Sequence, residues 1–228
     1  MEGQETFGLT STRRTRFRDR TEAGRLLARE LERYAGRDDV VVLALPRGGV
    51  PVGYEVAKAL GASLDVLVVR KLGVPGHREL AMGAIASGGL IVRDQELVHR
   101  LGIPEQMIRR AIADELRELE RREAAYRGDR KPLQLDGKTV ILVDDGLATG
   151  ATMRAAALAV REQNPARVIV AVPVAAAETC DRMRDDVDEV VCALTPVLFY
   201  AVGFWYDDFS QTSDDEVREL LARPADAN

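Results

Sequence analysis

The chain has few of the residues from which metal centres and disulfide-rich domains are built. Its 228 residues include two cysteines, Cys180 and Cys192, and two histidines, His77 and His99. Two cysteines cannot form a disulfide framework, and these two lack the paired spacing of a zinc site. Two histidines leave little material for a histidine-based metal centre. The composition therefore points away from a zinc protein and from a small disulfide-stabilised domain.

Long hydrophobic runs and a secretory signal are also missing from the sequence. The longest apolar stretch, residues 168–177, contains Pro173 and is much shorter than the roughly 18 residues that span a bilayer. No N-terminal segment joins a basic start to an apolar core, so we expect a cytoplasmic protein that does not contact a membrane. The net charge of −5 argues weakly against bulk binding to nucleic acid.

The chain is long and apolar enough for one large globular domain. Hydrophobic residues make up 46% of the sequence and charged residues 30%, which excludes a disordered protein. Five apolar runs predict strands, and the segments between them have helical periodicity. The runs are residues 40–45, 64–69, 140–143, 168–172 and 189–194. This alternation predicts an α/β fold with an open, mostly parallel five-stranded sheet flanked by helices.

The sequence divides into an arm, a core, a hood and a tail. We place the basic N-terminal arm at 1–20, the core at 21–194, the aromatic-rich hood with its closing helix at 195–223 and the tail at 224–228. The arm carries five arginines between Arg13 and Arg20. Such a segment is most simply a solvated tail or a contact with a partner subunit, although it could bind nucleic acid or a phosphorylated ligand.

The most informative segment is 140–152, in which an apolar strand is followed by Asp144, Asp145 and a turn of small residues. The turn leads into a helix, and the free N–H groups of a helix start suit a phosphate at the carboxyl edge of the sheet. Two carboxylates would repel that phosphate unless they face sugar hydroxyls or Mg²⁺. The alternative is an ordinary strand end in solvent, which does not account for the complete order of residues.

A second candidate loop follows the first strand as Leu45-Pro46-Arg47-Gly48-Gly49. It places an arginine at the ligand edge and lets backbone amides face an anion. It is neither a Walker loop nor a Rossmann fingerprint, because it lacks Gly-Lys-Ser/Thr and G-x-G-x-x-G. Taken alone, the segment could equally be an ordinary tight turn.

A third cluster begins with Arg70 and Lys71, which we expect to end the second strand at the same edge. Two cations there would help to hold a leaving group with several negative charges. The glycine-rich segment 71–90 follows and is expected to contain a mobile loop. Within it, residues 81–86 and 90–92 predict a hairpin around Ser87-Gly88-Gly89.

These motifs together resemble a known family. Segment 140–152 is similar to the phosphoribosyl-pyrophosphate (PRPP) signature of type I phosphoribosyltransferases. Pro-Arg-Gly-Gly, Arg-Lys-Leu-Gly and the run at 75–81 resemble a bacterial group of such enzymes with no assigned substrate. The likeness runs from about Phe17 to Leu221. The sequence departs from the pattern at Gly146, where an aliphatic residue is usual, and at Ala148, where a hydroxyl is frequent.

The resemblance implies a Mg²⁺-dependent enzyme with a small hood that transfers the phosphoribosyl group of PRPP to a nitrogen acceptor, such as a nucleobase, and releases pyrophosphate. Arg47, Lys71, Asp144 and Asp145 are the implied catalytic residues. Both acids would hold the ribose hydroxyls, and Mg²⁺ would come through PRPP with these acids as candidate ligands. The other implied PRPP-binding residues are Gly48, Gly49, Arg70, Ala148, Thr149, Gly150, Ala151 and Thr152.

The remaining implied roles belong to the mobile loop, the hood and a partner. His77, Arg78 and Glu79 are candidate loop residues, although an exposed His77 without a role is as good a reading. Phe204 and Trp205 could stack on the acceptor, but their aromatic run could equally form a hood core or a dimer contact. A homodimer fits the family.

Two other functions stay open at the level of the sequence. A regulatory protein that senses PRPP or a nucleotide without catalysis would need the acid loop but neither the paired cations nor the closing loop. A phosphate-binding hydrolase is disfavoured, because no Ser/His/Asp or two-metal constellation is apparent in the sequence.

Overall fold

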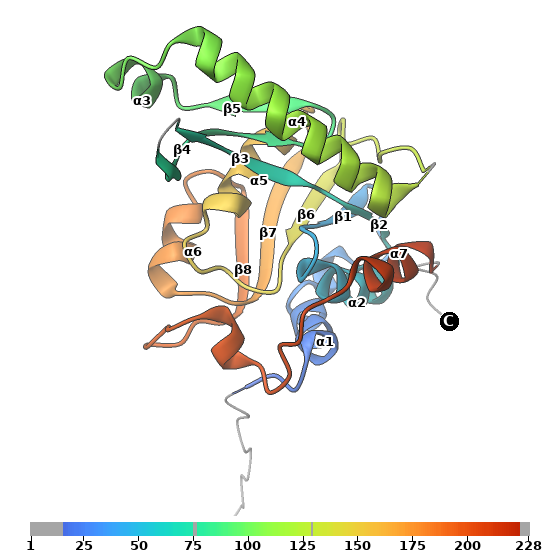
Figure 1. Ribbon diagram of the computed structural model, residues 1–228. Coiled ribbons are helices and arrows are strands. Elements are labelled where there is room, and N and C mark those ends of the chain that lie inside the picture. Colours follow the sequence, from blue (N-terminus) through green and yellow to red (C-terminus); the bar gives the residue numbers. More distant parts are fainter. Residues whose placement is uncertain (1–15, 75–76, 129, 224–228) are drawn as a thin grey trace, which may run out of the picture.

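Five strands form a wholly parallel sheet in the order β2-β1-β6-β7-β8 in the computed structural model (Figure 1). The model describes residues 16–74, 77–128 and 130–223, with the side chains of 77–79 left outside the description. The strands are β1 (Val40–Ala44), β2 (Ser63–Val66), β6 (Thr139–Val143), β7 (Arg167–Val174) and β8 (Glu189–Leu194). The predicted five-stranded α/β architecture is confirmed.

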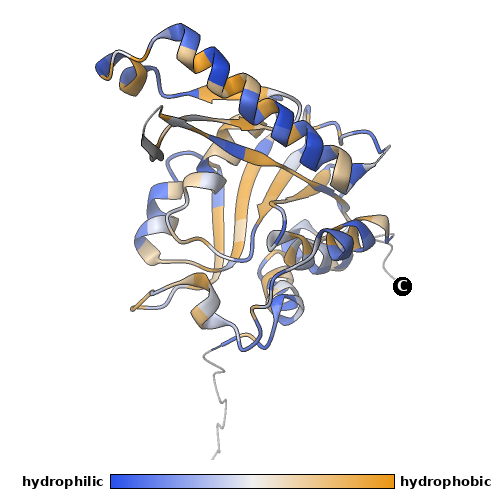
Figure 2. Cartoon of the chain, viewed as in Figure 1, coloured by the Kyte–Doolittle hydropathy of each residue, from blue (hydrophilic) through white to orange (hydrophobic). Residues whose placement is uncertain are grey.

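Helices cover both faces of this sheet because its strands are apolar on both sides. Helices α1 (Arg20–Glu30) and α2 (Gly49–Leu60) cover one face, and α5 (Ala151–Arg161) and α6 (Ala177–Met183) the other. Val42 and Ile141 pack with α1 and α2, whereas their neighbours Val41 and Val140 pack with α5. Successive strand residues point to opposite faces, and the strands are therefore almost uniformly hydrophobic (Figure 2).

A second, antiparallel sheet contains β3 (Val69–Val74), β4 (His77–Ala86) and β5 (Leu90–Arg93). It lies between α5 and the long helix α4 (Glu105–Arg127), and α3 (Gln95–Arg100) joins β5 to α4. The pairing of Ala86 with Leu90 confirms the predicted hairpin. The single strand predicted at 64–69 is wrong, because β2 ends at Val66 and Val69 already belongs to the second sheet. Leu67 and Val68 form the crossing, where the chain passes from one sheet to the other. Both are buried, so the apolar run continues without a break and does not reveal this crossing.

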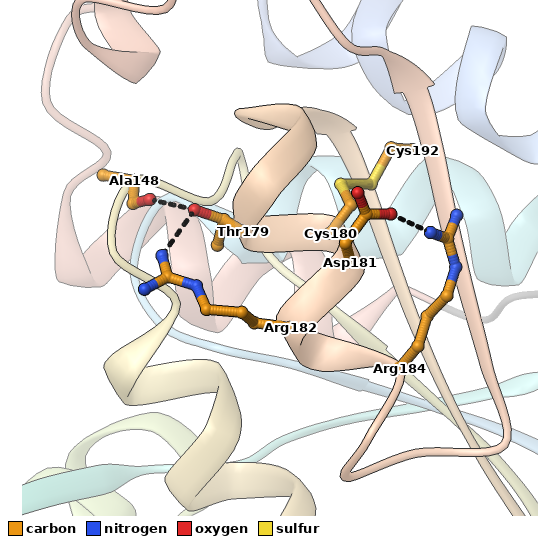
Figure 3. The surroundings of a disulfide bond; sticks show 7 residues. All are labelled: Ala148, Thr179, Cys180, Asp181, Arg182, Arg184 and Cys192. Atoms are coloured by element: carbon orange, nitrogen blue, oxygen red, sulfur yellow. Dashed lines mark hydrogen bonds and ion pairs between the residues drawn. A yellow bond between two sulfur atoms is a disulfide. The ribbon is translucent and has the colours of Figure 1, made fainter.

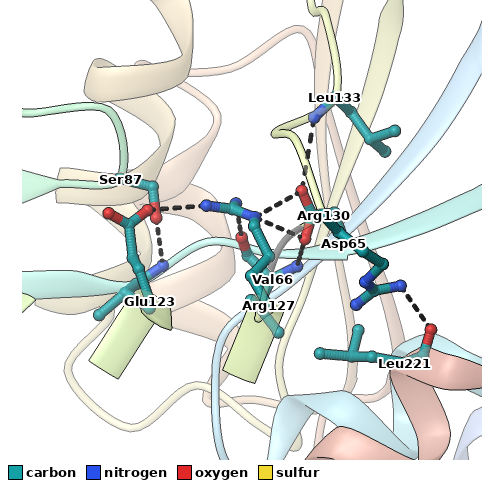
Figure 4. A network of polar contacts seen from close by, with 9 residues as sticks. Asp65, Val66, Ser87, Glu123, Arg127, Arg130, Leu133 and Leu221 are labelled. Atoms are coloured by element: carbon teal, nitrogen blue, oxygen red, sulfur yellow. Dashed lines mark hydrogen bonds and ion pairs between the residues drawn. The ribbon is translucent and has the colours of Figure 1, made fainter. Parts of the chain in front are cut away.

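A buried ion pair fastens this crossing (Figure 4). The Arg127 Nε atom donates to both carboxylate oxygens of Asp65 at 3.0 Å, and the two side chains are 8% and 6% exposed. Arg127 also donates to the carbonyl oxygen of Val66 at 2.8 Å and to Glu123 at 2.9 Å. The last turn of α4 is thereby attached to the end of β2, where the chain leaves the main sheet.

The N-terminal segment and the hood are joined to each other. The amide of Phe17 donates to the carbonyl oxygen of Trp205 at 2.8 Å. In return, the backbone amides of Asp207 and Asp208 donate to the carbonyl oxygens of Phe17 and Arg18 at 2.8 and 2.9 Å. The short helix η1 (Glu32–Tyr34) follows α1, and the short helix η2 (Val202–Trp205) lies in the hood. The last helix of the described chain is α7 (Asp214–Ala222). Among all the residues that the structure describes, no helix is long and apolar enough to cross a membrane. Most of the predicted arm and the tail lie outside the described residues.

Candidate functional site

Two loops meet at the point where the strand order of the main sheet changes direction. The chain leaves β1 for β2 on one side and later returns to β6 on the other, so the switch point lies between β1 and β6. Ligands of open α/β sheets bind at such a crevice. The loop 45–49 follows β1 and the loop 144–150 follows β6. The structure thus brings the first two predicted clusters together.

Glycines allow the two loops to touch. A Cβ atom on Gly48 would collide with the carboxylate of Asp145. One on Gly49 would lie 2.8 Å from the carbonyl oxygen of Val143 and 2.9 Å from the Cα atom of Asp144. The peptide between Pro46 and Arg47 is cis. Any larger residue at these two positions would push the backbone away from the acid pair.

Asp144 and Asp145 form a largely buried pair of carboxylates. The Oδ1 atom of Asp144 accepts the amide N–H of Asp145 at 2.8 Å, and the Oδ2 atom of Asp145 accepts Nε–H of Arg20 at 2.9 Å. Burial and the charge of Asp145 raise the pKa of Asp144, whereas Arg20 opposes the rise that burial causes in the pKa of Asp145. Two acids, of which Asp145 is paired with Arg20, can accept hydrogen bonds from hydroxyl groups.

The acid pair fits a metal ion only as part of a larger complex. Among the described residues, no three His, Cys, Asp or Glu side chains converge on one point. Asp144 and Asp145 could supply one or two carboxylates. Mg²⁺ is held in that way when substrate phosphates and waters complete its octahedral shell.

The loop that leads into α5 has the geometry of an anion site. Gly150 has a φ of +75° and precedes the first residue of α5, while Ala148, Thr149, Ala151 and Thr152 are exposed. The first N–H groups of a helix have no acceptor within the helix. A cavity of about 340 Å³ opens beside this loop and is lined by Arg154 and Arg182 and also by Asp185 and Asp186. The N–H groups at the start of α5 favour a phosphate there. Arg182 adds a positive charge, whereas Arg154 already pairs with Asp186 at 2.9 Å.

An unanticipated disulfide lies next to Thr179, which contacts this loop (Figure 3). It joins Cys180 of α6 to Cys192 of β8. The neighbouring Thr179 hydroxyl donates to the carbonyl oxygen of Ala148 at 2.9 Å, and Arg182 donates to the Thr179 hydroxyl at 3.4 Å. The cross-link therefore holds the helix that supports the loop. Two cysteines rule out a disulfide framework but still allow this single bridge between a helix and a strand, which no local pattern in the sequence marks.

The departure at Gly146 has a structural reason. A Cβ atom there would lie 2.6 Å from the Cγ1 atom of Val202 and 3.0 Å from the carbonyl oxygen of Val174. The glycine thus lets the hood helix η2 pack directly against the acid loop. An aliphatic side chain at this position would move the hood outward.

The structure separates the two predicted cations, Arg70 and Lys71. They do not end a strand of the main sheet but lie within β3, where successive side chains point to opposite faces. Arg70 forms an ion pair with Glu115 of α4 at 2.7 Å. Lys71 is exposed and shares a cavity of about 340 Å³ with Ala151 and Arg154 at the start of α5. Only Lys71 therefore faces the side of the anion loop.

The segment predicted as a mobile loop is mostly β-structure. β3 and β4 pair from Val69 opposite Ala86 to Val74 opposite His77, with irregular register at Gly73. The glycines of this segment suggest a loop, and they therefore conceal the pairing of β3 with β4. The side chains of His77, Arg78 and Glu79 lie outside the described residues. Their proposed roles, and the mobility of the segment, stay predictions.

The predicted acceptor residues have different surroundings. Phe204 is 48% exposed, and the guanidinium of Arg16 lies 4.3 Å from the centre of its ring. Trp205 instead packs on the cluster that contains Phe17 and Tyr206, and its Nε1 atom is buried without a hydrogen-bond partner among the described residues. Part of the aromatic run is thus a hood core, and Phe204 remains exposed enough to meet a ligand.

Several residues at this site carry no signal in the sequence. Arg20 belongs to the segment that the sequence predicts as a basic arm, yet its side chain is 12% exposed and pairs with Asp145. The Tyr206 hydroxyl donates to the carbonyl oxygen of Asp145 at 2.6 Å. Asp214, at the start of α7, lies 3.5 Å from Arg47. No local pattern marks these contacts, because each joins segments that are distant in the sequence.

Comparisons with a family model, with curated proteins and with solved structures all find phosphoribosyl transferases or proteins of similar fold. A family model described as the phosphoribosyl transferase domain matches residues 19–204. Proteins from two Mycobacterium tuberculosis strains, provisionally named as phosphoribosyl transferases, are 47% identical over 207 residues. That match covers 91% of this chain but 46% of the relatives, so the chain spans about half the length of the curated relatives it matches. The crystal structure of a Thermus thermophilus protein is similar at 44% identity and a TM-score of 0.82, covering 90% of this chain and 97% of that one.

Proposed function

Because the chain belongs to the phosphoribosyl transferase family, we propose that it transfers the 5-phosphoribosyl group of PRPP to a nitrogen acceptor. One observation carries the proposal: Asp144 and Asp145 lie against Gly48 and Gly49 at the switch point of the sheet. A carboxylate pair suits a sugar diol, and the N–H groups at the start of α5 suit a phosphate. Both are needed to hold a phosphorylated ribose.

The reaction needs positioning and electrostatic stabilisation more than acid–base chemistry. The acceptor nitrogen forms a bond to C1 of the ribose and releases its proton to water. The bond from C1 to the pyrophosphate oxygen breaks at the same time, and pyrophosphate leaves with the electron pair. Positive charge develops on the ribose and negative charge on the leaving group, so fixed charges nearby lower the barrier.

Each part of the site has a proposed role in that reaction. Asp144 and Asp145 would hold the ribose hydroxyls, and residues 148–152 the 5′-phosphate. Arg47 and the amides of Gly48 and Gly49 would hold pyrophosphate. Mg²⁺, bound through PRPP beside the acid pair, would neutralise part of the phosphate charge.

Lys71 keeps its proposed role as a cation that acts on PRPP, whereas Arg70 now has a weaker case. The ion pair with Glu115 already engages Arg70. Lys71 lies on β3, so a movement of the β3–β4 hairpin toward the site would carry it along. We propose this hairpin as the element that closes over PRPP and limits its hydrolysis.

A panel of acceptors tests the function. Purified protein is incubated with PRPP, MgCl₂ and single candidate acceptors, including purine bases, uracil and simple amines, and pyrophosphate release is measured. Release that depends on one acceptor and is lost in Asp145→Asn supports the proposal. Tight PRPP binding without release for any acceptor would favour the sensor. No binding and no release would contradict both.

A further inference from the structure

Arg20 joins three parts of the site that are far apart in the sequence. It is the first residue of α1, and its Nε atom donates to Oδ2 of Asp145 at 2.9 Å. The two side chains are 12% and 15% exposed. The Nε atom also lies 3.3 Å from the place that a Cβ on Gly48 would occupy. The guanidinium therefore sits where the acid loop and the glycine loop meet.

The same guanidinium holds the hood. Its Nη1 atom donates to the carbonyl oxygen of Ser210 at 2.7 Å, and its carbon lies 4.0 Å from the ring centre of Phe209. Tyr206, whose ring centre is 5.0 Å from that of Phe209, donates its hydroxyl to the Asp145 carbonyl at 2.6 Å. Asp145 is thus held through its side chain by Arg20 and through its backbone by the hood.

We propose that Arg20 is a positioning residue of the ribose site: it fixes the Asp145 carboxylate for a ribose hydroxyl and holds residues 206–210 beside it. The inference rests on the proposed function. One oxygen of Asp145 bonds to Arg20, which leaves the other oxygen to accept from the sugar. An arginine suits this place, because its rigid planar fork can bond to Asp145 and Ser210 at once while its face stacks on Phe209.

The geometry also predicts which ligands should depend on Arg20. Ligands that contain ribose use Asp145 and should lose affinity when its carboxylate is free to rotate. Free pyrophosphate does not use Asp145 and should be unaffected. A merely structural contact between α1 and the hood would weaken both classes of ligand equally, or neither.

Isothermal titration of the intact chain with PRPP, ribose 5-phosphate and pyrophosphate, each with MgCl₂, tests this distinction. We expect Arg20→Gln to weaken PRPP and ribose 5-phosphate by roughly 10-fold or more, the effect of losing a charged hydrogen bond, and to change pyrophosphate binding less than about 2-fold. Arg20→Lys keeps the charge without the planar fork, so its affinity for PRPP and ribose 5-phosphate should lie between those of the wild type and Arg20→Gln. The matched control is Arg25→Gln, on the same helix but 61% exposed and paired with Glu55, which should bind all three like the wild type.

A double-mutant cycle shows whether Arg20 acts through Asp145. Arg20→Gln in the Asp145→Asn background should cost little further PRPP affinity, because the group it positions is already altered. Additive losses, or equal losses for pyrophosphate, would overturn the proposal while leaving the function intact. Should Arg20→Gln fail to fold, Arg20→Lys carries the same test, and wild-type PRPP binding by that variant would overturn it. A wild-type chain that does not bind PRPP would refute the proposed function itself, and the role of Arg20 with it.

Discussion

The buried pair of Asp65 and Arg127 permits a quantitative prediction about stability. Asp65→Asn keeps the size of the side chain but removes the charge that faces Arg127, and an amide nitrogen would replace one accepting oxygen. Asp65 accepts Arg127 Nε at 3.0 Å, the Val66 amide at 2.8 Å and the Leu133 amide at 3.4 Å. Removing one partner of a buried ion pair costs about 3–5 kcal/mol, and Glu123 compensates only part of the remaining charge.

The free energy of unfolding in urea should therefore fall by about 3 kcal/mol or more, and the melting temperature by roughly 6 °C or more for a domain of this size. The control is Asp114→Asn, because Asp114 pairs with Arg117 on the surface of α4, where the two side chains are 56% and 75% exposed. That change should stay within about 0.5 kcal/mol. A loss below about 1 kcal/mol for Asp65→Asn would refute the reasoning that this charge is buried and required.

Three further predictions follow from other contacts. Cys180 and Cys192 are separated by 12 residues, so reduction should lower the free energy of unfolding by about 3 kcal/mol; two reactive thiols in the denatured, unreduced protein would contradict the disulfide. Arg37 and Thr139 lower the pKa of Asp39 to about 2, below its unfolded value. Asp39 therefore stabilises the fold above about pH 4, and this contribution disappears as the pH falls toward 2. In urea titrations at acid pH, the free energy of unfolding of Asp39→Asn should fall less between about pH 4 and pH 2 than that of the wild type. An equal fall in the two proteins would contradict the pairing. Thr149→Val should weaken ligands with a 5′-phosphate by about 10-fold in calorimetry while the backbone amides retain part of the binding; unchanged affinity would remove Thr149 from the site.

The elements that could be predicted from the sequence are those specified by local pattern. The run from Val140 to Val143 is apolar on both faces, which is the pattern of a short strand covered on both sides. The acids and small residues that follow it, and the glycines after β1, could be placed at one edge because parallel strands end there together. In the structure, Gly48 and Gly49 pack directly on the acid pair.

The elements that could not be predicted depend on contacts between distant segments. The apolar run 64–69 continues through a change of sheet, and periodicity cannot detect where a buried chain changes its partners. The pair of Arg20 and Asp145 spans 125 positions, and an arginine in a basic segment looks like a solvated one. The sequence predicts that Arg70 and Lys71 end a strand of the five-stranded sheet at the same ligand edge, yet both lie within β3, whose alternation points them to opposite faces.

Titration of the wild-type chain and of Asp145→Asn with PRPP in the presence of MgCl₂ tests the central claim most directly. Circular dichroism first establishes that the variant is folded. We predict that the wild type binds PRPP and that Asp145→Asn loses about 10- to 150-fold in affinity, the effect of one charged hydrogen bond. Equal PRPP affinity in the two folded proteins, or no binding by the wild type, would contradict the assignment of Asp144 and Asp145 to a phosphoribosyl site.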